Sequence, residues 1–436
     1  SDNMEGSTRA KRAVPRARCG HGPHLRRGFK KEAPAPIREN VGCRQKRQSY
    51  TRKGPAMTKH TTSSLKSEAR KCVGLDVHKN SIAIAVADGQ GARLVGVIAN
   101  DLGQLRKTLR KLASPAALRV CYEAGPCGYV VYRYLRRLKI NCVVVAPSLI
   151  PKRPGDRVKT DRRDALALAR LLRSGELTSI WVPDADHEAL RDLIRAREDS
   201  VEDRQRARHR LVKFLLRLGI IAPAGRPWTL RHRRWLDGLR WEDLAQQLVF
   251  SQYRQSLEEI DARIALFDRA IAAAAAKSPH APTIAALQAM RGVKLLTAAT
   301  IVAEVGDLTR FQSPRQLMSY AGVTPSEYSS GARIRRGCIT KTGNAHLRRV
   351  LIESAWHYRH RPGTSAALRE RQRGLHPEVC RIASRAQQRL HHRYIGLAAR
   401  GKIKQQVVVA IARELLGFIW SIAHIVHATQ PLERVA

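Results

Sequence analysis

Four acidic residues stand where carboxylates could act together. Asp76 interrupts the apolar run CVGLDVH, Glu123 ends the run LRVCYE, and Asp161 and Asp164 lie three residues apart in VKTDRRDALALARLL. A carboxylate inside an apolar strand is costly unless it is paired or bound to metal. Carboxylate oxygens are the ligands that Mg²⁺ prefers, and such ions promote phosphodiester chemistry. The four acids therefore predict a site for Mg²⁺, or for Mn²⁺, that acts on phosphate.

Each acid taken alone also has a structural explanation. Asp161 suits the first turn of a helix, Glu123 a strand end, and Asp164 an ion pair with a nearby arginine. On a helix, however, Asp161 and Asp164 share one face and present two carboxylates together. The hypothesis of a joint site therefore requires that three separate segments of the chain converge.

The segments around these acids predict alternating strands and helices. The Val- and Ile-rich runs CVGLDVH, SIAIAVAD and ARLVGVIA, with a turn at 88–91, indicate a three-stranded meander. A helix over 101–112, the strand LRVCYE, a helix over 128–138 and the strand NCVVVA follow. We therefore expect an α/β domain over 71–182, a mixed sheet covered by helices.

The charge of the chain predicts a polyanionic partner. Its 80 Lys and Arg against 36 Asp and Glu give a net charge of +44, which indicates salt-sensitive binding to phosphates. Residues 1–70 hold 18 basic and 5 acidic residues, so the remainder still has 62 against 31. We expect 1–70 to be a basic disordered tail, with Met57 as a candidate start and Ser1 to Gly6 set aside.

Two further regions follow the α/β domain. Long charged helices over 185–218 and about 241–277, joined by a Pro-, Gly- and Trp-containing loop at 219–235, predict a coiled helical hairpin over 183–278 for linking or oligomerisation. Residues 279–436 predict a mostly helical domain, with a loop segment from Gly322 to Gly343. The run VVVAIARELLGFIWSIAHIVH is interrupted by Arg413 and Glu414, so we expect a packed core helix rather than a membrane span.

The cysteines and the apolar runs of the sequence indicate the cell compartment. The eight cysteines form no CxxC pair, which favours reduced thiols over a zinc ribbon or a disulfide framework. The sequence has no run of about 18 uncharged apolar residues and no apolar signal-peptide core at its start. A cytoplasmic, nucleoid-associated protein without a membrane partner is expected.

The segments VGLDVHKNSIAIAVAD, RVCYEAGPCGYVVYRYL and VKTDRRDALALARLL resemble the N-terminal domain of transposases of the IS110 and IS1111 group, and the resemblance spans nearly all of residues 72–427. It implies an RNase H-like, RuvC-type fold in which Asp76, Glu123, Asp161 and Asp164 are catalytic and bind metal. It also implies donor and target DNA as substrates, a structured non-coding RNA as guide, and a homo-oligomer, dimer or tetramer.

The stretch YAGVTPSEYSSGARIRRGCITKTGNAHLRRVLIESA resembles the C-terminal signature of the same family. A serine just before a glycine is the family's nucleophile, which implies Ser330 here, with Ser329 and then Ser326 as alternatives. The two halves would form a composite site. Without the resemblance, a Ser-Ser-Gly run is typical of a flexible loop.

Seven basic residues are candidates for contacts with nucleic acid. Residues 283–306 indicate two helices joined by a tight Arg-Gly-Val-Lys turn, as in a helix-hairpin-helix that binds phosphate, or in an ordinary helical hairpin. The cations around the serines could stabilise phosphoryl charge, or lie on a solvated helix face. The candidates are Lys294, Arg333, Arg335, Arg336, Lys341, Arg348 and Arg349.

The sequence thus predicts a DNA transposase or recombinase of an insertion element. Two alternatives remain open. A metal-dependent, junction-resolving nuclease that uses water would still cut DNA after Ser330→Ala. A non-catalytic RNA- or DNA-binding protein would bind nucleic acid without cutting it.

Overall fold

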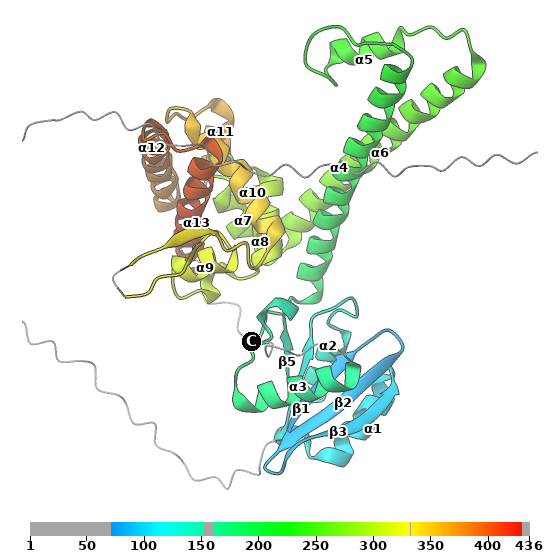
Figure 1. Ribbon diagram of the computed structural model, residues 1–436. Coiled ribbons are helices and arrows are strands. Elements are labelled where there is room, and N and C mark those ends of the chain that lie inside the picture. Colours follow the sequence, from blue (N-terminus) through cyan, green and yellow to red (C-terminus); the bar gives the residue numbers. More distant parts are fainter. Residues whose placement is uncertain (1–70, 152–159, 332, 430–436) are drawn as a thin grey trace, which may run out of the picture. The chain divides into compact units, whose positions relative to one another are not determined.

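The computed structural model of the chain describes residues 71–151, 160–331 and 333–429. Its N-terminal part is built on a five-stranded sheet in the order β3-β2-β1-β4-β5 (Figure 1). The first three strands form the predicted antiparallel meander, and β4 and β5 continue the sheet parallel to β1. The mixed α/β layer predicted from the sequence is therefore confirmed. The strands are β1 Lys71–Val77, β2 Ser81–Asp88, β3 Gly91–Ala99, β4 Leu118–Glu123 and β5 Asn141–Val145.

Helices cover both faces of this sheet. On one face, Val73, Leu75 and apolar side chains of the neighbouring strands pack against α1 (Leu102–Leu112) and α2 (Val130–Arg137). The other face carries mostly small side chains and packs against α3 (Asp161–Ser174). Because the central strands are buried on both sides, they are apolar almost throughout. The short 3-10 helices of this part are η1 Pro115–Ala117 and η2 Pro147–Leu149.

Two long helices, α4 (Ala185–Arg217) and α6 (Leu244–Lys277), form the predicted helical hairpin. The segment between them, predicted to be a loop over 219–235, contains α5 (Leu230–Asp237) and is corrected here. Thr229 caps α5 by accepting a hydrogen bond from the His232 backbone, and Leu236 is buried against the hairpin. The Pro and Gly residues before Thr229 obscured this short helix in the sequence.

The C-terminal part is mostly helical, as predicted. The segment from Gly322 to Gly343, predicted to be a loop, instead contains a two-stranded antiparallel sheet, because backbone groups of β6 and β7 pair with each other. The elements are α7 Ala281–Leu287, α8 Leu295–Val305, η3 Leu308–Arg310, α9 Pro314–Tyr320, β6 Pro325–Glu327, β7 Arg336–Ile339, α10 Ala345–Ala355, η4 Trp356–Arg359, α11 Ala366–Gln372, α12 Pro377–Ala399 and α13 Lys404–Thr429.

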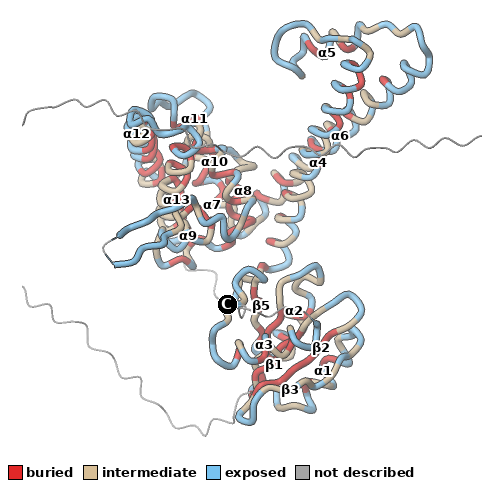
Figure 2. Tube along the Cα trace, viewed as in Figure 1, coloured by how far each residue is buried: buried red, intermediate tan, exposed pale blue. Residues whose placement is uncertain are grey.

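The core of the C-terminal part extends into the base of the helical hairpin. Leu190 and Ile194 of α4, with Ile271 and Ala275 of α6, belong to the same buried cluster as α8, α10 and α13 (Figure 2). The start of α4 and the end of α6 are therefore fixed against these helices by apolar packing.

Among the described residues, α13 is the one helix long and apolar enough to cross a membrane by length and composition. One face of α13, from Val407 to Val426, is buried in the core of the C-terminal part. Glu414 lies on its other side and pairs with Arg389 and Arg393 of α12. α13 therefore packs as a core helix in this fold, as predicted.

Candidate active site

Two of the four candidate acids end neighbouring parallel strands. Leu75 of β1 is paired with Tyr122 of β4, so Asp76 and Glu123 each come one residue later at the same level of the sheet. Side chains alternate along a strand. Cys121 of β4 packs in the cluster beneath α3, so Asp76 and Glu123 lie on the face that α3 covers.

The other two acids lie in the first turn of α3. The Thr160 hydroxyl caps this helix by accepting a hydrogen bond from the Arg163 backbone at 3.3 Å. Gly74 of β1 allows the close approach of α3, because a Cβ at this position would lie 2.3 Å from the Ala165 carbonyl oxygen. The helix start therefore lies against the strand that carries Asp76.

The structure brings Asp76 and Asp161 together around a residue that the sequence analysis missed. His78 Nε2 lies 3.2 Å from Asp76 Oδ2 and 3.5 Å from Asp161 Oδ1. One ligand atom from each residue lies within 4.8 Å of the other two. Glu123 and Asp164 lie outside this closest group among the described residues. The sequence signal that could have identified His78 is its position two residues after Asp76, since residues two apart at the end of a strand point to the same side of the sheet.

The carboxyl group of Asp76 is poorly solvated, since its side chain is only 15% exposed. Burial raises its pKa, the charge and hydrogen bond of His78 lower it, and the carboxylates of Asp161 and Asp164 raise it further. Burial, the largest cause, therefore outweighs the stabilisation that His78 gives to the ionised form of Asp76. The carboxylates of Asp76 and Asp161 and the imidazole of His78 form a donor set that fits a divalent cation.

The candidate serines lie on the hairpin of β6 and β7. Ser330 and Arg333 exchange backbone hydrogen bonds of 3.2 and 3.1 Å, which closes a tight turn through Gly331, whose φ of +56° suits glycine. The Tyr328 backbone N–H donates to the Arg335 carbonyl at 2.9 Å. This register places Tyr328 opposite Arg335, and Ser329 opposite Ile334.

The two serines face opposite sides of this ribbon. The Ser329 hydroxyl donates to Glu327 Oε1 at 2.9 Å and accepts from the Arg335 backbone at 3.2 Å, so its hydrogen bonds are used within the hairpin. Ser330 shares the other face with Arg333 and Arg335, because opposed side chains in an antiparallel pair lie on one side. Among the described residues, its exposed hydroxyl has no hydrogen-bond partner.

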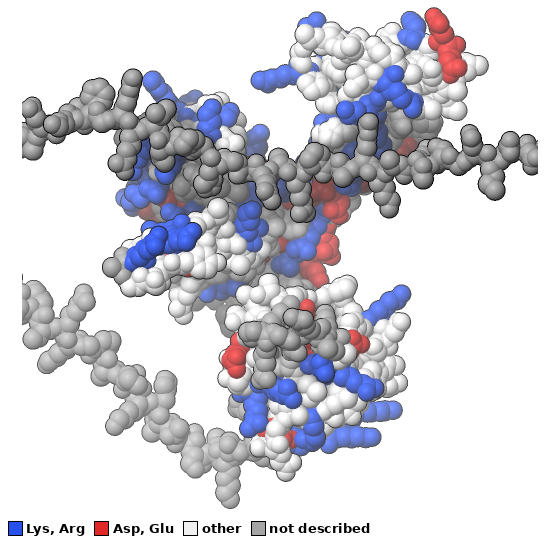
Figure 3. Space-filling view, viewed as in Figure 1, with Lys and Arg blue, Asp and Glu red and all other residues white. Residues whose placement is uncertain are grey.

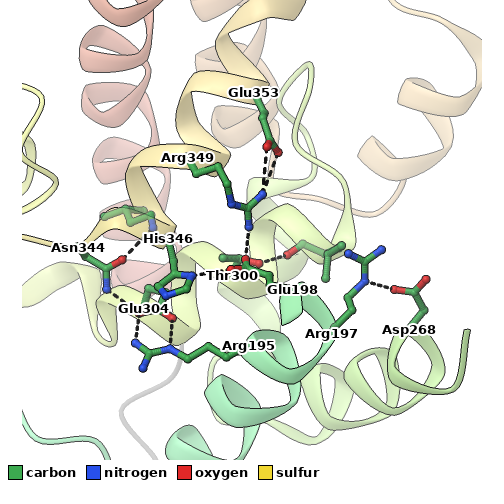
Figure 4. A network of polar contacts seen from close by, with 12 residues as sticks. Arg195, Arg197, Glu198, Asp268, Thr300, Glu304, Asn344, His346, Arg349 and Glu353 are labelled. Atoms are coloured by element: carbon green, nitrogen blue, oxygen red, sulfur yellow. Dashed lines mark hydrogen bonds and ion pairs between the residues drawn. The ribbon is translucent and has the colours of Figure 1, made fainter. Parts of the chain in front are cut away.

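The segment from Gly322 to Gly343, which carries the candidate serines and is called the serine segment below, is held at its end by the buried carboxylate of Glu304 (Figure 4). The fully buried Glu304 accepts two hydrogen bonds of 3.0 Å from Arg195 of α4 and one of 2.5 Å from the Asn344 side chain. Asn344 also caps α10. Burial acts to raise the pKa of Glu304, but the bonds from Arg195 and Asn344 outweigh it and hold this pKa below its usual value.

The candidate nucleic-acid contacts fall into two sets. Arg348 donates to the Ala321 carbonyl at 3.0 Å, and Arg349 pairs with Glu198 and with Glu353, so both guanidinium groups are engaged within the fold. The others are exposed. They are Lys294, which precedes α8, and Arg333, Arg335, Arg336 and Lys341 around the serine hairpin. Figure 3 shows that Lys and Arg also lie over other parts of the surface.

Comparison with known proteins gives the same family for both parts of the chain. A model for DEDD transposases of the IS110 type matches residues 73–220, and a model described as "Transposase IS116/IS110/IS902 family" matches residues 284–369. The first match contains the acidic site, and the second contains the serine hairpin.

Individual relatives cover most of the chain. The transposase y4qE of Sinorhizobium fredii is 46% identical over 80% of this chain and 88% of its own length. The transposase of insertion sequence element IS1533 of Leptospira borgpetersenii is 33% identical over 76% of this chain and 97% of its own. The transposase of element IS1111A of Coxiella burnetii is 24% identical over 69% of this chain and 83% of its own.

The fold, the acidic site and these relatives together define a transposase, an enzyme class that cuts and recombines DNA. The chain belongs to the IS110 family of insertion-sequence transposases. DNA is accordingly its substrate class, and the acidic cluster is the place where the described residues could hold a divalent metal.

Proposed function

We propose that this transposase cuts and rejoins the DNA of an insertion element through a covalent link to Ser330. The observation that carries the assignment is the difference between the two adjacent serines. The hydroxyl of Ser329 is engaged by Glu327 and the Arg335 backbone, whereas that of Ser330 has no partner among the described residues and shares a face with two arginines. A nucleophile has to be accessible and close to positive charge that stabilises the phosphoryl group.

The proposed step is a phosphoryl transfer that conserves the energy of the phosphodiester bond. Ser330 Oγ loses its proton and forms a bond to phosphorus, while the bond from phosphorus to one deoxyribose oxygen breaks and that oxygen takes up a proton. Arg333 and Arg335 lie where their cations can offset the charge on the non-bridging oxygens. Reversal by a hydroxyl of another strand end joins DNA and restores the serine without ATP.

The N-terminal part supplies the metal site in this proposal and is assigned an RNase H-like, RuvC-type fold. Asp76, Glu123, Asp161 and Asp164 would hold Mg²⁺ or Mn²⁺, which when bound neutralises phosphate charge and polarises the reacting oxygens. The donor set around Asp76 and the raised pKa of this carboxyl support the assignment. This part of the site and the serine hairpin are proposed to act on one scissile phosphate as a composite site.

The remaining assignments complete the proposal. The chain is divided into a basic tail (1–70), an acidic-site domain (71–182), a helical hairpin (183–278) and a serine domain (279–436). It acts as a homo-oligomer, a dimer or tetramer, on donor and target DNA at the nucleoid. A structured non-coding RNA guides it, for which the basic surface provides phosphate contacts. The exposed cations Lys294, Arg336 and Lys341 are proposed to contact nucleic acid.

The test is to look for DNA linked to protein. Purified protein, its co-purified RNA and element-end DNA are incubated with Mg²⁺ and separated on denaturing gels, with Asp76→Ala, Ser330→Ala and Ser329→Ala as variants. We expect an adduct that Asp76→Ala and Ser330→Ala abolish and Ser329→Ala retains. Cut ends without adduct in both serine variants would identify a nuclease that uses water. Binding without cutting under any metal would identify a non-catalytic protein.

A further inference from the structure

We propose that His78 is a protein ligand of the divalent cation, so that this site combines an imidazole nitrogen with carboxylate oxygens. The inference rests on the proposed function and deepens it by naming a ligand outside the four acids. The closest group of ligand atoms in the acidic site is Asp76, His78 and Asp161. The histidine therefore lies at the centre of the donor set.

The distances fit ligation of a single ion. Divalent cations such as Mg²⁺ and Zn²⁺ bind oxygen and nitrogen at about 2.0–2.2 Å. Two ligand atoms at right angles around such an ion are then about 3 Å apart, by the geometry of an octahedron of that size. His78 Nε2 lies 3.2 Å from Asp76 Oδ2 and 3.5 Å from Asp161 Oδ1. One ligand atom from each of the three residues lies within 4.8 Å of the other two, close enough for all three to surround one ion.

The backbone holds His78 in place before any ion binds. The His78 N–H donates to the Ser81 carbonyl at 2.9 Å, which closes the turn from β1 to β2. The Asn100 side chain, from the end of β3, donates to the His78 carbonyl at 2.7 Å. Both backbone polar groups of His78 are thereby hydrogen-bonded, so the backbone that carries the imidazole is already in place.

Solvent exposure leaves the rest of the coordination sphere open. The side chain of Asp76 is 15% exposed, whereas those of His78 and Asp161 are 52% and 57% exposed. Asp76 thus forms the floor of the site and the other two its rim. Water and a phosphate oxygen of DNA can reach the remaining positions, as a catalytic metal site requires.

A nitrogen ligand predicts a metal preference. Carboxylate and water suit Mg²⁺, whereas imidazole suits later first-row metals, whose affinity rises from Mn²⁺ to Co²⁺. We therefore expect the protein to bind Mn²⁺ and Co²⁺ more tightly than Mg²⁺, and this margin to depend on His78. The same ligands would then hold Mg²⁺ more weakly than Mn²⁺ or Co²⁺, in each case together with DNA phosphate.

The experiment measures metal binding directly, without turnover. Titration calorimetry with Mg²⁺, Mn²⁺ and Co²⁺ compares the wild type with His78→Ala, Asp76→Asn and His209→Ala. Pulsed EPR of the Mn²⁺ complex reports whether a nitrogen is bound to the ion. His209 is an exposed histidine on α4 and serves as the matched control. Circular dichroism of each variant establishes that it is folded.

The expected result is specific to the histidine. His78→Ala should lower Co²⁺ and Mn²⁺ affinity by about tenfold or more, change Mg²⁺ affinity less, and remove the nitrogen signal, while His209→Ala changes nothing. Nitrogen coupling that persists in folded His78→Ala, or unchanged Co²⁺ affinity, would overturn the inference. If Asp76→Asn abolishes binding while His78→Ala does not, the acidic site stands and only the histidine ligand fails.

Discussion

Two neighbouring serines of the hairpin differ because of backbone pairing rather than residue type. Ser329 faces Glu327 and Arg336, which form an ion pair at 3.5 Å, and its hydroxyl is hydrogen-bonded to the first of them. Ser330 closes the turn and faces Arg333 and Arg335. A shift of one residue in register would exchange these surroundings, since alternate side chains lie on opposite faces.

This difference predicts unequal roles for two arginines next to each other. Arg335→Gln should slow formation of the protein–DNA adduct by about tenfold or more, because it removes positive charge from the face of Ser330. Arg336→Gln removes the same charge from the opposite face, where the guanidinium pairs with Glu327, and should slow adduct formation less. Adduct yield over time on denaturing gels measures both. Equal slowing by the two variants would show that the hairpin contributes only general charge.

At the scale of elements, the acidic site depends on how closely α3 approaches the sheet. The face of the sheet beneath α3 carries small residues such as Cys72, Ala83, Ala85 and Cys121. Gly74 lies at the closest point, where an added Cβ would meet backbone atoms of α3 at 2.3 and 2.5 Å. Backbone cannot rotate away as a side chain can, so the helix itself would have to move.

Gly74→Ala should therefore weaken both the fold and the metal site. Overpacking of this kind costs about 1–3 kcal/mol, and displacement of α3 moves Asp161 away from Asp76. Thermal unfolding and Mn²⁺ titration measure the two effects. Gly89→Ala, in an open turn with no atom within 4 Å of the added Cβ, is the control. Wild-type Mn²⁺ affinity in Gly74→Ala would show that the site does not depend on this contact.

A second junction between elements joins α4, α8 and α10. Glu304, at the end of α8, receives Arg195 from α4 and Asn344 from the start of α10. The Tyr320 hydroxyl donates to the Glu304 carbonyl at 3.0 Å. Asn344 directly follows the serine segment. The carboxylate of Glu304 therefore fixes both the base of the helical hairpin, through Arg195, and the end of the serine segment, through Asn344.

Glu304→Gln should destabilise the protein by about 2 kcal/mol at pH 7, since it replaces charged hydrogen bonds in a buried position. The pKa of Glu304 is lower in the folded state than in the unfolded chain, so its contribution is present above the unfolded pKa and is lost as pH falls through the folded value. Denaturant unfolding at pH 7 and pH 4 should therefore show a smaller difference from wild type at pH 4. The exposed Glu353→Gln is the control, and a pH-independent difference would contradict the ion-pair explanation.

At the scale of the whole molecule, the net positive charge is spread along the chain and is not confined to residues 1–70. Residues 1–70 carry a surplus of 13 positive charges out of the total of 44. The remaining surplus lies in residues 71–436, where several exposed cations surround the serine hairpin. Binding of DNA or RNA to such a surface releases counterions and is therefore weakened by salt.

A protein lacking residues 1–70 should keep most of this salt dependence. Each neutralised phosphate contributes about −0.9 to the slope of log affinity against log salt on duplex DNA. We expect the shortened protein to retain more than half of the wild-type slope in fluorescence anisotropy with a labelled duplex. A slope near zero would assign electrostatic binding to the removed residues. Ser330→Ala, which keeps every charge, should leave the slope unchanged.

The sequence by itself determined the order of strands and helices in the N-terminal α/β part, the two long helices of the hairpin, the packed terminal helix and the family. Apolar periodicity and short Gly- or Asp-containing turns are local signals, and burial of the sheet on both faces makes the strands almost uniformly apolar. Asp76 stood out because it departs from such a pattern, whereas Asp161 and Asp164 stood out because their spacing places them on one face of a helix. Their nearness could only be hypothesised, since it depends on pairing across the sheet.

Only the tertiary structure decided which side chains of the candidate site meet, and which short elements form in segments that were predicted to be loops. His78 was missed because its approach to Asp161 joins residues far apart in the chain. The helix α5 was missed because Pro and Gly precede it, and the hairpin of β6 and β7 because a Ser-Ser-Gly run at its turn is typical of a loop. The distinction between Ser329 and Ser330 arises from cross-strand register, and the engagement of Arg348 and Arg349 from partners elsewhere in the fold. Residue types determine which chemistry is available, but contacts between distant segments decide which side chains remain free to perform it.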